Sequence, residues 1–144
     1  MNRLIAISAL LVSSATLLHA DTLEEKKYWK GQMDYVQQNL DTANKDCGVS
    51  FSFDWVDKPK LRTETTRNNN SPNGVCGAII DEVAGLCRAD ADGKAAVKAK
   101  IKGFTCGWAK PRTLDLSGGI VHFLGNFEES NFSDWAKPWL EKHL

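Results

Sequence analysis

The sequence predicts an α+β domain in which helices pack on one face of an antiparallel sheet of about four strands, with two disulfides joining the elements. Apolar residues recur at helical spacing in the first half of the chain, whereas most segments with strand-like alternation follow in the second half. Strands grouped after helices favour this class over an alternating parallel fold. The length of 144 residues corresponds to one domain, expected over residues 21–144, and its four cysteines suffice for two disulfides.

The first twenty residues have the layout of a secretory signal peptide. Arg3 precedes an apolar run over residues 4–18, and Ala20 ends the run just before a charged segment. The run is shorter than the roughly 20 residues that span a bilayer, which argues against a membrane anchor. We expect cleavage after Ala20, with Ala15 as the alternative, and a mature protein that is secreted or periplasmic and has no membrane span.

The first predicted element after this segment is a long helix. Thr22 and Glu25 form a capping box, and Gly48 is suited to end the helix. One apolar stripe at spacings of three and four runs between them: Trp29, Met33, Val36, Leu40 and Ala43. Residues 49–55 then alternate apolar and polar without a break, which predicts a half-buried strand.

Residues 57–72 are polar and rich in asparagine, and we expect a long surface loop there. Loops of this length are often functional or mobile, so Arg67 and Asn69 are candidate binding residues. Both alternatives, a functional loop and a merely mobile one, stay open at this point.

A second helix is expected to begin at Ser71 and Pro72 and to extend to about Cys87. Residues 90–93 read as a turn, because the EF-hand pattern around them fails at its first and last ligand positions. A short helix follows over residues 94–100. No other grouping of side chains predicts a metal or a cofactor.

The C-terminal third of the chain changes to strand-like alternation. Three short segments carry it: 104–108, 113–116 and 120–124. Gly118 and Gly119 are typical of a two-residue hairpin turn between the last two. Residues 132–140 predict a final helix, which Pro138 should interrupt or kink.

Helix geometry restricts the pairing of the four cysteines. Cys76 and Cys87 lie eleven positions apart on one predicted helix, so about 16 Å separates them along its axis. A disulfide requires Cα atoms within about 7 Å, which excludes this pair together with its complement. Up-and-down packing favours Cys47–Cys87 with Cys76–Cys106; a returning loop would instead give Cys47–Cys76 with Cys87–Cys106. Zinc is disfavoured, because the cysteines are not closely paired in sequence.

The hairpin places Asp115 directly opposite His122 on neighbouring strands. A carboxylate beside an imidazole occurs in many base-catalysed sites. The neighbouring apolar residues Leu114, Leu116 and Val121 are predicted to face the core, however. We therefore expect Asp115 and His122 to face solvent as an exposed ion pair. Asp115 and His122 are therefore weak catalytic candidates.

A local basic cluster is the second binding candidate. Its members are Lys94, Lys98, Lys100 and Lys102, with Lys110 and Arg112 further along. A solvated helix face is the simpler interpretation. The tryptophans Trp29, Trp55 and Trp108 fall on predicted core faces, which favours packing over a sugar-binding platform.

These observations favour a non-enzymatic binding or inhibitor domain with an unknown protein or cell-envelope partner. The alternative is a small hydrolase that acts on cell-wall or polysaccharide material. The chain carries 18 basic and 18 acidic side chains, a balance that gives no general attraction for nucleic acid. We expect a monomer without a cofactor.

Overall fold

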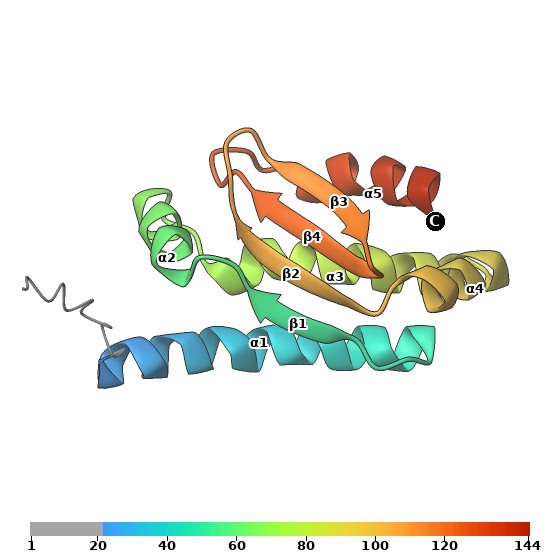
Figure 1. Cartoon of the computed structure of the whole chain (residues 1–144), viewed down its shortest axis with the longest axis horizontal. Coiled ribbons are helices and arrows are strands. Elements are labelled where there is room, and N and C mark those ends of the chain that lie inside the picture. The colour runs from blue at the N-terminus through green and yellow to red at the C-terminus, as the bar shows by residue number, and fades with distance from the viewer. Residues whose placement is uncertain (1–21) are drawn as a thin grey trace, which may run out of the picture.

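The structure, a computed structural model, describes residues 22–144 (Figure 1); the predicted signal peptide lies outside them. Its elements in chain order are α1 (Leu23–Cys47), β1 (Ser52–Trp55), α2 (Lys58–Arg67), α3 (Pro72–Ala89), α4 (Ala91–Lys100), β2 (Gly103–Trp108), β3 (Thr113–Ser117), β4 (Ile120–Gly125) and α5 (Phe132–His143). One four-stranded sheet has the order β1-β2-β4-β3. In Figure 1, α3 runs behind this sheet, and no helix lies in front of it.

The α+β class and the four strands are confirmed, but the sheet is mixed and not antiparallel throughout. β2 pairs in parallel with both β1 and β4, and only β3 and β4 are antiparallel. Three helices separate β1 from β2, and a crossover of that length lets two strands run in the same direction. Alternation of apolar and polar residues predicts which face of a strand is buried, but it does not predict the direction of the strand.

Helix α3 is the centre of the hydrophobic core. Its buried residues include Val75, Cys76, Ile79, Ile80, Val83, Ala84 and Cys87. They pack against Val36 and Leu40 of α1, against Phe104 and Phe123 of the sheet, and against the buried side of α5. A helix that is apolar on several sides in this way must be covered by several elements.

Both favoured disulfides are present. Cys47 at the end of α1 bonds to Cys87 near the end of α3, with 5.1 Å between the Cα atoms. Cys76 at the start of α3 bonds to Cys106 of β2, with 5.9 Å between the Cα atoms. The continuous helix α3 keeps Cys76 and Cys87 apart, as its length predicts.

The long first helix is confirmed together with both of its ends. Thr22 Oγ1 accepts a hydrogen bond from Glu25 N at 3.2 Å, and Gly48 adopts φ 70°, a left-handed conformation that suits glycine. The short fourth helix begins earlier than expected, because Asp90 caps it by accepting from Gly93 N at 2.6 Å. The last helix continues through Pro138.

The prediction of a long loop at residues 57–72 is wrong, because most of this segment forms α2. Asp57 caps this helix by accepting from Lys60 N, and Pro59 occupies its first turn. The buried side chains of α2 are Leu61, Glu64 and Thr65. Two of the three are polar, so the apolar stripe that reveals an amphipathic helix is missing here.

Removing the Cys47–Cys87 disulfide with Cys47→Ala and Cys87→Ala should lower the free energy of unfolding by about 4 kcal/mol, because the bridge closes a loop between residues 40 positions apart. Urea denaturation of the oxidised protein measures the loss. Peptide mapping without reduction is the check on the pairing itself, and a Cys47–Cys76 peptide would contradict it.

Candidate functional site

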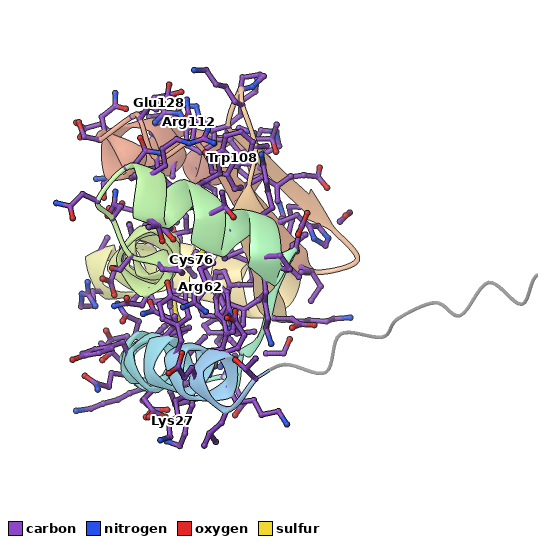
Figure 2. All side chains as sticks on the ribbon, turned by 90° about the vertical axis from the view of Figure 1, so that its left-hand side faces the viewer. Lys27, Arg62, Cys76, Trp108, Arg112 and Glu128 are labelled. Carbon is purple, nitrogen blue, oxygen red and sulfur yellow. A yellow bond between two sulfur atoms is a disulfide. The ribbon has the colours of Figure 1, made fainter. Side chains whose placement is uncertain are left out.

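The three parallel strands β1, β2 and β4 end at the same edge of the sheet, which we call the carboxyl edge. Helix α2 follows β1 there, residues 109–112 follow β2, and residues 126–131 follow β4. Sheets with parallel strands commonly bind ligands beyond the carboxyl ends of those strands. Figure 2 looks onto this end of the molecule, where Trp108, Arg112 and Glu128 lie together in the upper part of the view.

Buried polar groups concentrate at the carboxyl edge. In the part of the chain that the structure describes, the buried polar or charged residues are Glu64, Thr65 and Asn126, and all three lie on α2 or directly after β4. A buried charge is costly unless it is paired, so the surroundings of Glu64 decide what this edge can do.

Glu64 is held as an anion between two cations. Its side chain is 2% exposed, Lys60 Nζ lies 2.9 Å from Oε1, and Arg67 Nη1 lies 3.2 Å from Oε2. Both contacts are ion pairs within α2, at spacings of four and three residues. The contact with Lys60 lowers the pKa of Glu64, burial opposes the effect, and the charges of Arg67 and Lys110 add to the lowering.

Lys60 also connects α2 to Trp108 at the end of β2. Its ammonium lies 4.5 Å from the centre of the indole ring, in cation–π geometry. Trp108 packs on the core as expected, but its Nε1 is buried and has no hydrogen-bond partner within residues 22–144. The indole thus has one buried donor that no group of the described residues uses.

Arg112 fixes the two loops of this edge to one another. Its side chain is 11% exposed; Nε lies 2.8 Å from Glu129 Oε2, and Nη1 donates to Asn131 Oδ1 at 2.9 Å. The guanidinium group also lies 4.4 Å from the centre of the Trp135 ring. Asn126 donates to the second oxygen of Glu129 at 2.8 Å, so one carboxylate joins both loops.

The outermost contact of the edge is the ion pair between Lys110 and Glu128. The two side chains lie 2.5 Å apart and are 57% and 50% exposed. The hydrogen bond and the charge of Glu128 raise the pKa of Lys110. Both groups are accessible, and either one can exchange its partner for a group on another molecule.

The structure separates the predicted binding residues into two groups. Arg67 and Asn69 lie at the end of α2, and Lys110 and Arg112 follow β2, so these four belong to the carboxyl edge. Lys94, Lys98, Lys100 and Lys102 precede β2 and lie at the opposite end of the molecule (Figure 1). The basic cluster expected from the sequence is therefore not one cluster, because strand β2 separates its first four lysines from Lys110 and Arg112.

The lysines of that second group do not form one face. Lys100 Nζ donates to the backbone oxygen of His143 at 3.1 Å. Lys94 lies near Gly48 at the end of α1, and Lys102 lies against Gly119 in the hairpin turn. These placements disperse the positive charge, which weakens the case for an anion-binding patch.

Asp115 and His122 pair in register as expected, on the outer face of the sheet. Cys106 points toward α3 through its disulfide, so its neighbour Thr105 points to the outer face. His122 Nδ1 lies 2.8 Å from Thr105 Oγ1, and within residues 22–144 no ion pair joins His122 to Asp115. The expected ion pair is thus replaced by a row of Asp54, Thr105, His122 and Asp115 across the four strands.

Sequence reasoning missed Lys60, Glu64, Asn126 and Glu129 at the carboxyl edge. A signal for two of them existed: Asp57 and Pro59 are typical of a helix start, and Glu64 then stands four positions after Lys60. The remaining residues come from segments far apart in the chain, and only the parallel pairing of the strands brings them together.

Comparison with protein-family models, with curated proteins and with solved structures finds no match to this chain. Within residues 22–144, no group of histidine, cysteine and carboxylate side chains is arranged to hold a metal ion. In the same range, none of the helices combines the length and apolar character needed to cross a membrane. The function must therefore be argued from the site itself.

Replacing the buried carboxylate with Glu64→Gln should destabilise the protein at neutral pH, because Lys60 and Arg67 lose their shared partner. Since folding lowers the pKa of Glu64 from 4.5, its stabilising effect is present above pH 4.5 and is lost as the pH falls through the lowered pKa. The difference in unfolding free energy between the two proteins should therefore shrink in acid. Urea denaturation at a series of pH values measures it.

Asp115→Asn is the matched control, because Asp115 is exposed and forms no ion pair within the described residues. A constant difference between wild type and Glu64→Gln down to the most acidic pH would contradict the assignment of Glu64 as a paired anion.

Proposed function

We propose that this chain is a secreted or periplasmic, non-enzymatic domain that binds or inhibits a protein partner through its carboxyl edge. The observation that carries the proposal is the fixed set of charged and polar groups there: Arg112, Glu129 and Asn126 hold the two loops together, while Lys110 and Glu128 remain accessible. Charged groups held in place on a rigid scaffold favour recognition, because little side-chain freedom is lost on binding.

Two further features support an exported binding domain. All four cysteines form disulfides, which persist in oxidising compartments such as the periplasm and the extracellular space. The edge also mixes both signs of charge over a short distance, with four ion pairs formed by the three carboxylates of Glu64, Glu128 and Glu129. A mosaic of this kind selects a partner with the complementary pattern and suits a protein surface better than a uniformly charged polymer.

A hydrolase that acts on cell-wall or polysaccharide material is the second candidate, and the row on the outer face of the sheet favours it. Thr105 offers a hydroxyl group to His122, and Asp115 stands on the other side of the imidazole. Asp54 and Asp115 are three strand spacings apart, about 14 Å, which exceeds the roughly 5–9.5 Å between glycosidase carboxyl groups. A hydrolase here would therefore use His122 as a base toward an ester or amide bond.

Exchanging the two charges with the double variant Lys110→Glu and Glu128→Lys tests the proposal. The exchange preserves an ion pair within the chain and reverses the charges that a partner meets. We expect the variant to fold as the wild type does and to lose capture of the partner from native culture fluid or envelope extract. Affinity capture with quantitative mass spectrometry measures the loss.

Lys98→Glu serves as the control, since it reverses a charge on α4 at the opposite end of the sheet. It should leave capture unchanged, as should Asp115→Asn combined with His122→Gln. Normal capture by the charge-exchanged variant would refute recognition through the carboxyl edge. Hydrolysis of cell-wall material that Thr105→Val abolishes without unfolding would replace the binding function with the enzymatic one.

A further inference from the structure

A cavity of about 460 Å³ lies between the C-terminal halves of α3 and α5 and the start of α4, away from the carboxyl edge. We call it the acidic groove. Its apolar lining consists of Leu86 and Ala89 of α3, Ala96 of α4, and Leu144. The volume falls within the roughly 300–1,000 Å³ of typical ligand pockets, and it can hold a few side chains of another molecule.

Charge around the acidic groove is strongly one-sided. Four carboxylates line it, those of Glu82, Asp90, Asp92 and Glu141, against the single cation of Lys137. Within residues 22–144, none of these five groups forms an ion pair, in contrast to the balanced carboxyl edge. No cation of the described residues therefore neutralises these carboxylates, and a cation from another molecule can pair with them.

Two helix ends add to this negative potential. Helix α3 ends at Ala89 and α5 ends at His143, both beside the groove, and the carbonyl groups at a helix C-terminus carry partial negative charge. The start of α4 contributes the opposite sign, but Asp90 and Asp92 offset it; Asp90 accepts directly from Gly93 N. The field inside the groove thus favours ammonium and guanidinium groups.

Gly85 keeps the groove open in the C-terminal half of α3. A Cβ atom at this position would meet only the side-chain nitrogen of Arg88, at 3.9 Å, so close packing does not require a glycine here. Glycine within a helix lowers its stability relative to alanine. The absent side chain instead leaves room in the groove that Gly85 itself lines.

We propose that the acidic groove binds a basic amphipathic segment of a partner protein, in which lysine or arginine alternates with small apolar residues. The apolar side chains would rest on Leu86, Ala96 and Leu144, and the cations would meet Glu82, Asp92 and Glu141 at the rim. This site lies apart from the carboxyl edge and does not depend on recognition there. The apolar lining favours such a segment over a free polyamine, which has no branched apolar group.

A fluorescent, acetylated peptide with the repeat Lys-Leu-Ala is the probe, and fluorescence anisotropy with the purified protein measures its affinity. We expect binding that weakens as salt increases, because ion pairs at the rim are screened. Glu82→Gln with Glu141→Gln should weaken binding about tenfold, as expected for the loss of two surface ion pairs. Gly85→Leu should abolish binding by filling the groove while preserving the helix.

The charge-exchanged variant of Lys110 and Glu128 is the matched control, and it should bind the peptide normally whatever its effect on partner capture. Circular dichroism and thermal melting confirm that each variant is folded. Unchanged binding by folded Gly85→Leu would overturn the proposal. Equal binding of a peptide with glutamate in place of lysine, or displacement of the peptide by spermidine at comparable concentration, would overturn it as well.

Discussion

The covalent attachment of α3 at both of its ends is the constraint on which the rest of the structure depends. Cys87 joins the end of the helix to α1, and Cys76 joins its beginning to Cys106 of β2. The helix between them is buried on several sides and contacts α1, α4, α5 and the sheet. Each disulfide therefore fixes a different layer against the same central element, and neither layer can shift without moving α3.

The position of the second disulfide has a direct effect on the carboxyl edge. Cys106 lies two residues before Trp108, the last residue of β2, so the strand that carries the indole is bonded to the core close to its end. Lys60 then reaches over the ring from α2 and pairs with Glu64. The ion pairs of this edge are thus arranged on a backbone that is already held in place.

Much of the fold was predictable from local physical signals. The capping box at Thr22 and Glu25, the glycine turn at residues 118–119 and the helical rise between Cys76 and Cys87 each correspond to one geometric rule, and each agrees with the structure. Helix α2 was missed because it buries Glu64 and Thr65 where an apolar stripe would be expected. A glutamate is buried only where cations pair with it, and the hydrophobic pattern of the sequence does not show where those cations lie.

The candidate site was less predictable, because it depends on strand direction. The sequence identifies Lys110 and Arg112 as part of a basic cluster, but it groups them with lysines that lie at the other end of β2. Alternation gives the buried face of each strand, but it does not distinguish parallel from antiparallel pairing, and here β2 runs parallel to both of its neighbours. Only that pairing places Glu64, Trp108 and Glu129 at one edge.

The same parallel pairing has a consequence for the order in which the chain folds. The β3–β4 hairpin joins segments that are neighbours in sequence and can form early. Ser52 and Gly103, which pair in β1 and β2, are separated in sequence by α2, α3 and α4. Closing so long a loop costs chain entropy before any contact compensates for it, so pairing of this kind is slow. We therefore expect β1 to be the last strand to join the sheet, and until it does, one side of the central strand β2 is exposed to pairing with other chains.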